Sequence, residues 1–220
     1  MRRLLLILKN TSEAPDIPGE MPNMPGIPSI PEQYIGTTTK LFYTSTTDAV
    51  ITPYSTTAFG STITSNAYDS NIDMFVIDFN GDVTTVGSNA FRNRSDLENV
   101  IMPNSVTSIG DRAFYYCSGL KSINTGENVT SIGASAFSTC NLTAISLGSN
   151  LTSIGQYAFY GCESLATIYC MATTPPNGAY GMMESIAETC KIYVPMGTEN
   201  AYKSAKYWSD YSDMIYGYNF

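Results

Sequence analysis

The side chains best suited to chemistry in this sequence are five cysteines, because histidine is absent. Without histidine the chain lacks the commonest general base and the commonest metal ligand, which excludes Ser-His-Asp and Cys-His catalysis within it. No two cysteines form a CxxC pair, which argues against a zinc site. We therefore assign no catalytic residue, no metal ligand and no cofactor.

The cysteines fall into two groups. Cys117, Cys140 and Cys162 each follow a phenylalanine at the same short distance. A metal or redox site is one interpretation, but their spacing follows the apolar residues, so we predict three buried, reduced and unreactive thiols. Cys170 and Cys190 each adjoin a predicted strand, and a disulfide between them stays open because its geometry is strict.

Carboxylates offer little more. The run Asp78–Asp82 resembles the start of a calcium loop, but the twelfth position of that loop is Asn89 rather than an acid, and a hairpin explains Asn80-Gly81 better. The acids show no repeated pairing that would define a glycosidase site. A carboxylate-dependent hydrolase is thus a remote alternative function.

The composition limits the partners. The net charge is −8, the sequence pI is about 4.4, and only 14% of residues are charged. An acidic chain repels nucleic acid and anionic membranes, and no apolar run is long enough to insert as a helix. The 16 tyrosines and the many Ser, Thr and Asn residues suit protein or glycan contact, and equally a solvated β surface.

Residues 1–32 are predicted to be a flexible segment and a Pro-rich linker. The apolar core at residues 4–8 is shorter than a signal peptide needs. Pro22, Pro25, Pro28 and Pro31 keep a spacing of three, which matches one edge of a polyproline II rod. A PxxP ligand and a semi-rigid spacer are both open, and the absence of flanking Arg or Lys favours the spacer.

From residue 83 the chain repeats itself about four times, with a period of 22–23 residues up to residue 172. Each repeat contains a Val-Thr-Ser-Ile-Gly-like segment, an Ala-Phe pair and a Leu-x-x-Ile segment; the phenylalanines are Phe91, Phe114, Phe137 and Phe159. One such unit cannot bury its own apolar face, whereas stacked copies form a continuous core. We therefore predict a repeat solenoid, mainly β, with short turns, little helix and buried Phe114, Phe137 and Phe159.

The unit Val-Thr-Ser-Ile-Gly-x-x-Ala-Phe-x-x-Cys-x-x-Leu-x-x-Ile resembles the BspA-type leucine-rich repeat of bacterial surface proteins. The first repeat departs from it, with Arg94 in place of the cysteine. Segments around Leu41-Phe42-Tyr43 and around Thr174-Pro175-Pro176 resemble the leader and the end of such arrays. The resemblance implies a leucine-rich-repeat architecture and a secreted or cell-surface adhesin-like protein, although the weak N-terminal signal leaves a cytoplasmic origin open.

Caps are predicted at both ends of the array. Residues 33–82 should form an N-terminal cap whose hairpin turns at Asn80-Gly81 and covers the first edge. Residues 173–220 should form a C-terminal cap, with a short helix over residues 199–208 closing the last edge.

Two surfaces are candidates for binding. One comprises tyrosines that flank the Ala-Phe positions: Tyr115, Tyr116, Tyr157 and Tyr160. The other is the strand face between the Leu and Ile positions, with the candidates Asn99, Ser122, Asn124, Ser146 and Tyr169. Either could also be merely solvated. The predicted function is a non-catalytic protein–protein or protein–glycan interaction module; the alternative is a structural or accessory scaffold without its own ligand.

Overall fold

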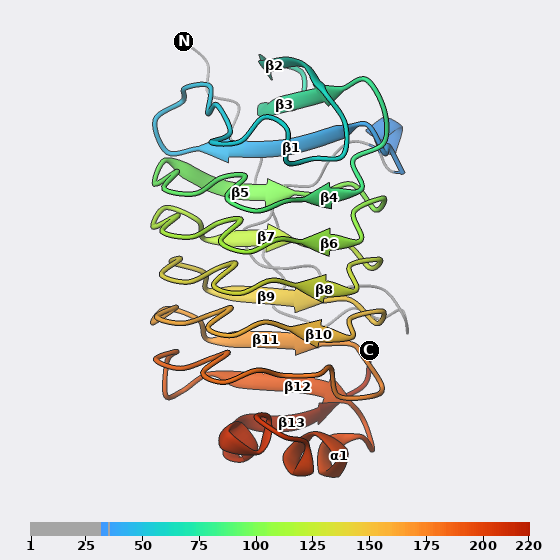
Figure 1. The fold of residues 1–220 in the computed structure, drawn as a ribbon, viewed down its shortest axis with the longest axis vertical. Helices are drawn as coiled ribbons and strands as arrows, with labels where there is room; N and C mark the ends of the chain where they lie inside the picture. Colours follow the sequence, from blue (N-terminus) through green and yellow to red (C-terminus); the bar gives the residue numbers. More distant parts are fainter. Residues whose placement is uncertain (1–31, 35) are drawn as a thin grey trace.

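The computed structural model describes residues 32–34 and 36–220, so the predicted Pro-rich linker and the signal-like start lie outside the described residues. The described chain is a stack of coils, and each central coil passes through a short strand, a series of turns and a longer strand (Figure 1). Two sheets run along this stack. The predicted solenoid, mainly β with little helix, is confirmed.

The nine-stranded sheet has the order β13-β12-β11-β9-β7-β5-β1-β3-β2, and its strands from β5 to β13 are parallel. Its members are β1 (Lys40–Ser45), β2 (Ile63–Asp69), β3 (Met74–Phe79), β5 (Leu97–Ile101), β7 (Ser122–Asn124), β9 (Ala144–Leu147), β11 (Thr167–Cys170), β12 (Lys191–Pro195) and β13 (Ile215–Tyr218). The four-stranded parallel sheet has the order β10-β8-β6-β4 and comprises β4 (Thr85–Val86), β6 (Ser108–Ile109), β8 (Ser131–Ile132) and β10 (Ser153–Ile154).

The phenylalanine of each repeat lies in the core between the two sheets. Phe114, Phe137 and Phe159 are each 0% exposed, and adjacent ring centroids are 5.3 and 5.4 Å apart with nearly parallel planes. Phe91 and Phe59 continue the column toward the N-terminus. The predicted phenylalanine ladder is confirmed, and it extends one coil further than the repeat motif.

The glycine after each Val-Thr-Ser-Ile segment is required by close packing rather than by an unusual turn. A Cβ on Gly110 would lie 2.5 Å from the backbone nitrogen of Ser88, and a Cβ on Gly133 would lie 2.5 Å from that of Asp111. Neither glycine has a positive φ. Successive coils therefore approach too closely at these positions for any side chain.

The N-terminal cap contains a hairpin, but not at the predicted place. β2 and β3 pair antiparallel across the turn at residues 70–73, where Asp73 has φ 57°. Asn80 and Gly81 instead carry the chain from β3 toward β4 in the other sheet, and neither has the positive φ that a type I′ hairpin needs. β1 pairs antiparallel with both β3 and β5, so it joins the cap to the parallel array.

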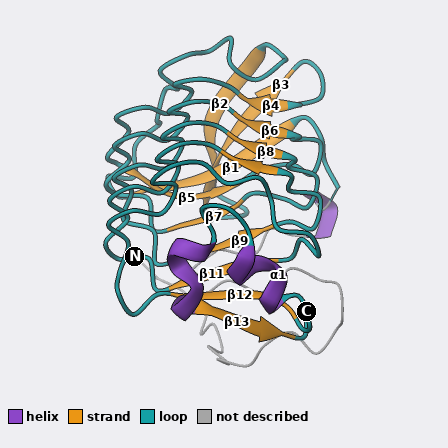
Figure 2. Ribbon diagram, turned by 60° about the horizontal axis from the view of Figure 1, so that its bottom comes forward, coloured by secondary structure: helices purple, strands orange, loops and turns teal. Residues whose placement is uncertain are grey.

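The solenoid continues through the segment predicted as the C-terminal cap. β12 pairs in register with β11, and β13 pairs with β12. The helix α1 (Glu199–Ser204) ends before the predicted residue 208, and a 3-10 helix, η2 (Ser209–Met214), follows it. Both lie at the C-terminal end of the stack (Figure 2). Trp208 is buried there, and its Nε1 donates to the Pro176 carbonyl at 2.7 Å.

Candidate functional site

The four predicted tyrosines on the turns between the two sheets form two separate clusters. Tyr115 and Tyr116 contact edge to face, with centroids 4.6 Å apart. Tyr157 contacts Tyr160 at 5.5 Å and also Tyr180 at 5.7 Å, a residue that the repeat pattern did not reveal. The coil between the clusters has the smaller residues Ser138 and Thr139 at the corresponding positions. The structure therefore does not join the four tyrosines into one continuous patch.

These clusters are accessible at three of their five rings. Tyr116 is 50% exposed, Tyr160 is 40% exposed and Tyr180 is 59% exposed. Within the described residues, no group is hydrogen-bonded to these hydroxyls. An exposed aromatic ring with an unpaired hydroxyl combines apolar contact with hydrogen bonding, which suits recognition of a partner.

Two of these tyrosines occupy left-handed backbone. Tyr116 has φ 58° and Tyr157 has φ 57°, a conformation that costs a bulky residue energy. The equivalent of Tyr116 in the next repeat but one is Gly161, at φ 69°. The turns hold this conformation through hydrogen bonds between coils, such as the 3.0 Å bond from the Tyr116 amide to the Ser138 carbonyl.

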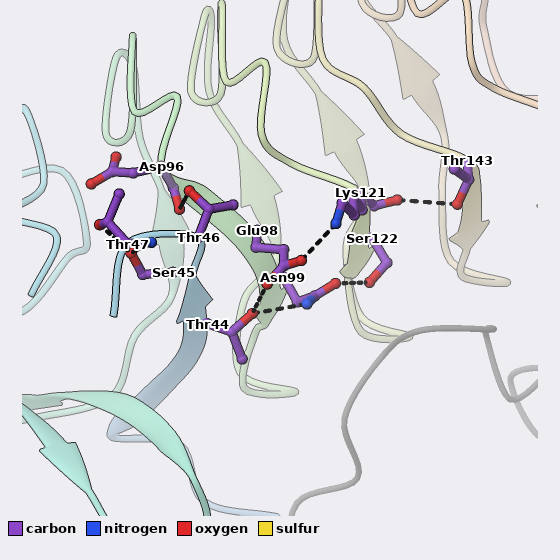
Figure 3. Close-up of polar contacts among 10 residues, drawn as sticks. All are labelled: Thr44, Ser45, Thr46, Thr47, Asp96, Glu98, Asn99, Lys121, Ser122 and Thr143. Atoms are coloured by element: carbon purple, nitrogen blue, oxygen red, sulfur yellow. Dashed lines mark hydrogen bonds and ion pairs between the residues drawn. The ribbon is translucent and has the colours of Figure 1, made fainter. Parts of the chain in front are cut away.

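The predicted strand face is less accessible than expected. Asn99 is 8% exposed, Ser122 is 1% exposed and Ser146 is 2% exposed, whereas Asn124 and Tyr169 are half-buried. Figure 3 shows a chain of polar contacts across the strands: Ser122 Oγ donates to Asn99 Oδ1 at 2.5 Å, and Asn99 Nδ2 donates to Thr44 Oγ1 at 2.8 Å. These side chains are used to bond neighbouring strands, so direct ligand contact at Asn99 and Ser122 is not supported.

An aromatic patch that the sequence analysis missed lies beside Tyr169 on the last strands. Tyr169 stacks on Tyr193 at 5.4 Å, and Tyr218 lies 5.4 Å from Tyr193 and 5.8 Å from Tyr169. Tyr216 and Phe220 extend the patch. Burial raises the pKa of Tyr169, and the nearby Tyr218 and Tyr193 hydroxyls add to the rise.

The signal for this patch was present in the sequence. β12 alternates between outward residues and buried ones, which is the pattern of a half-buried strand, and in β13 Tyr216 and Tyr218 alternate with Ile215 and Gly217. Both strands fall outside the regular repeat, so the repeat register did not reveal which tyrosines would become neighbours.

The cysteines are interior. Cys117, Cys140 and Cys162 are at most 3% exposed, and each thiol donates to the carbonyl of the phenylalanine one coil before it, as in the 2.9 Å bond from Cys117 Sγ to Phe91. Burial raises the pKa of the Cys117 and Cys162 thiols to about 12. Cys170 and Cys190 are buried free thiols rather than a disulfide, and Cys170 Sγ lies 3.3 Å from the Tyr202 hydroxyl.

A shallow, open depression of about 400 Å³ lies beside Tyr180 at the C-terminal end, between the turn side and η2. Met183, Tyr211 and Met214 contribute apolar surface, while Glu184, Glu188 and Asp210 are the acids at its border. Residues 32–34 and 36–220 contain no cluster of three or more His, Cys, Asp or Glu side chains that could hold a metal ion. No helix in that part of the chain is long and apolar enough to cross a membrane.

The fold and these surfaces define a leucine-rich-repeat solenoid with outward aromatic clusters. A family model described as a BspA type leucine rich repeat region matches residues 34–166 and 84–189, with 6 copies. The chain therefore belongs to the BspA-type leucine-rich-repeat family, as its repeat motif predicted. The copies outnumber the four predicted repeats because the array continues into both predicted caps. No curated protein matches this chain.

Several solved structures are similar to parts of the chain. A leucine-rich repeat protein from Bacteroides ovatus is 26% identical over 54% of this chain and 36% of that one, with a TM-score of 0.36. The pneumococcal vaccine antigen PcpA is 16% identical over 62% and 42%, with a TM-score of 0.41. A leucine rich cell surface protein from Faecalibacterium prausnitzii is 16% identical over 78% and 55%, with a TM-score of 0.35. This chain thus spans between 36% and 55% of the lengths of these proteins.

Proposed function

We propose that this protein is a non-catalytic, adhesin-like module that binds a protein or glycan partner at a bacterial cell surface. The observation that carries the proposal is the pair of tyrosine clusters on the turn side, Tyr115 with Tyr116 and Tyr157 with Tyr160, joined there by Tyr180. Tyr116, Tyr160 and Tyr180 are exposed and Tyr115 and Tyr157 are half-buried, while the hydroxyls of all five have no hydrogen bond within residues 32–34 and 36–220. The membership of the BspA family supports the surface location.

Aromatic and amide contacts should supply most of the affinity. The chain has few charged residues, so counterion release and electrostatic steering contribute little. Tyr side chains provide a large contact area with few rotatable bonds, which lowers the entropy lost on binding. We therefore expect an affinity that changes less than about threefold between low and moderate salt.

The test is a variant in which Tyr115, Tyr116, Tyr157 and Tyr160 are replaced by serine in the full chain. Binding to any protein or glycan recognised by the parent should fall by about tenfold or more, the effect of losing one strong aromatic contact. A matched control replaces Tyr54 and Tyr68 by serine, since these exposed tyrosines lie on the N-terminal cap. Their loss should leave binding unchanged.

Two results would contradict the proposal. One is unchanged binding in the quadruple variant, which would return the tyrosine clusters to a solvated role. The other is an affinity that collapses with salt, which would indicate a charged binding surface. A parent chain that binds neither a glycan array nor any captured protein would favour the scaffold alternative.

A further inference from the structure

One row of residues on the side of the large sheet away from the core crosses the sheet without interruption. Asn124, Tyr169, Tyr193 and Tyr216 in this row are accessible, whereas Phe42, Ile101 and Ser146 are buried. Direct strand register links each member to the next, from β1 through the repeats to β13: Phe42, Ile101, Asn124, Ser146, Tyr169, Tyr193 and Tyr216. We call this the outer row. Its members all point away from the phenylalanine ladder, because residues on one strand face alternate with those on the other.

The outer row is aromatic at both ends. At the N-terminal end, Tyr34 packs against Phe42 with centroids 5.4 Å apart, and Ile101 belongs to the same apolar cluster. At the other end, Tyr169, Tyr193 and Tyr216 follow one another on adjacent strands. The described chain begins at Glu32, two residues before Tyr34, so its first described residues lie at one end of this row.

The tyrosines at the far end differ from the tyrosines that build the fold. Tyr202 donates to the Ala172 carbonyl, and the Tyr211 hydroxyl accepts from the Met183 amide. By contrast, in residues 36–220 no group is hydrogen-bonded to the hydroxyls of Tyr169, Tyr193 and Tyr216. These groups would pair well with a ligand that offers backbone carbonyls together with apolar rings.

We propose that the outer row binds the Pro-rich segment of the same chain, residues 15–31. A polyproline II segment has no internal hydrogen bonds, so its carbonyls are free to accept from tyrosine hydroxyls, and its proline rings pack against aromatic side chains. The spacing of three in Pro22, Pro25, Pro28 and Pro31 places proline along one edge of such a rod.

The lengths agree. From Pro22 to Pro31 a polyproline II segment extends about 28 Å, at about 3.1 Å for each residue. From β1 to β12 there are five strand spacings, or about 24 Å at about 4.8 Å each. A polyproline II rod whose Pro31 lies near β1 is therefore long enough to place its four prolines along the row as far as Tyr193, with about 4 Å to spare.

The charges also agree. The segment from residue 10 to residue 31 carries Glu13, Asp16 and Glu20 and no Lys or Arg. Those acids precede Pro22, so they would lie at the far end of the row. Lys191 is exposed there, with its Nζ 5.9 Å from the centroid of the Tyr216 ring, and its charge complements theirs.

This inference goes beyond the proposed function and does not depend on it, since the turn-side tyrosines lie on a different side of the solenoid. It also gives the proline-rich motif a role as a ligand, for which the sequence alone left both a PxxP ligand and a semi-rigid spacer open. A bound segment would cover Tyr169, so any partner directed to that part of the strand face would compete with it.

The test uses the full chain with Gly26→Cys, labelled with a nitroxide; the five native thiols are buried, so the new one is labelled selectively. A bound segment gives a broad electron paramagnetic resonance spectrum. Replacing Tyr169, Tyr193 and Tyr216 by serine should shorten the rotational correlation time of the label by about threefold or more. Replacing Pro22, Pro25, Pro28 and Pro31 by serine should do the same without altering the solenoid.

The control variant with Tyr54 and Tyr68 replaced by serine should keep the broad spectrum. A mobile label in the parent, or a broad spectrum that survives both the tyrosine and the proline changes, would overturn the proposal. Dilution distinguishes the source of the segment: a spectrum unchanged over about 100-fold dilution supports binding within one chain, because the local concentration of a tethered segment is fixed. A spectrum that sharpens on dilution would assign the contact to a second copy instead and overturn it.

Discussion

The inner and outer sides of the same coils differ in how far residue types vary from one coil to the next. Inside, the phenylalanine column repeats one residue type with ring spacings of 5.3 to 5.4 Å. Outside, the outer row changes from Ile101 to Asn124, Ser146 and Tyr169 over the same four coils. An inner side chain is enclosed and must fit the side chains of the coils above and below it. An outer side chain is not packed on its open side, so its size and type can vary from coil to coil. Recognition is therefore expected on the outer positions.

The largest test of this contrast is Phe137→Ala. Phe137 is fully buried between Phe114 and Phe159, so its truncation leaves a cavity and should lower the free energy of unfolding by about 3–5 kcal/mol. Urea denaturation of the parent and the variant measures the loss. Asn124→Ala, one outer position in the adjacent coil, removes only the 2.9 Å bond that Asn124 Oδ1 accepts from the Gly126 amide, so it should lower the stability by about 0.5–1.5 kcal/mol. Equal losses in the two variants would contradict the distinction.

The buried thiols predict a pH dependence that the outer residues do not share. Burial raises the pKa of Cys140 well above the value of 9.0 for an unperturbed thiol. The folded state holds this proton more tightly than the unfolded state, so the stability is complete below about pH 9 and falls as the pH rises further. Between pH 8 and pH 10 the Cys140 thiol should contribute a loss of about 1.4 kcal/mol.

Urea midpoints of the parent and Cys140→Ala at both pH values isolate that contribution, because the other titrating groups are common to the two proteins. The variant should show the shallower decline with pH. As an independent check, a thiol reagent should leave Cys117, Cys140 and Cys162 unmodified until denaturant is added. Rapid labelling of the native protein would show that these three cysteines lie at the surface, contrary to the structure.

The smallest expected effect is a gain in stability at an outer position. Tyr116 has φ 58°, and the equivalent position in a later repeat is occupied by Gly161. Tyr116→Gly should therefore relieve backbone strain. After the larger chain entropy of glycine is subtracted, the gain should be about 0.5–1 kcal/mol. The neighbouring change Tyr115→Gly, where φ is not positive, should destabilise the protein. Thermal denaturation compares the two, and a loss in both would show that the Tyr116 ring packs more than its exposure indicates.

Several features followed from the sequence because they depend on periodicity alone. The spacing of Phe114, Phe137 and Phe159 fixed which side chains stack, and the cysteine that follows each one fell into the core with it. The prediction of a hairpin at Asn80-Gly81 was wrong because it rested on a local dipeptide and not on periodicity. Long-range pairing of β1 with β3 and β5 decided where the chain turned.

By itself, the amino-acid sequence determined the repeat, the solenoid and the buried columns, because a stack of equal units forces equivalent residues into contact. Only the tertiary structure decided which outward residues meet. Tyr169, Tyr193 and Tyr216 come from a regular repeat and from two irregular C-terminal segments, and strand register alone makes them neighbours. Likewise, the polar bonds from Asn99 to Thr44 and Ser122 join side chains of three different strands, which no local pattern encodes.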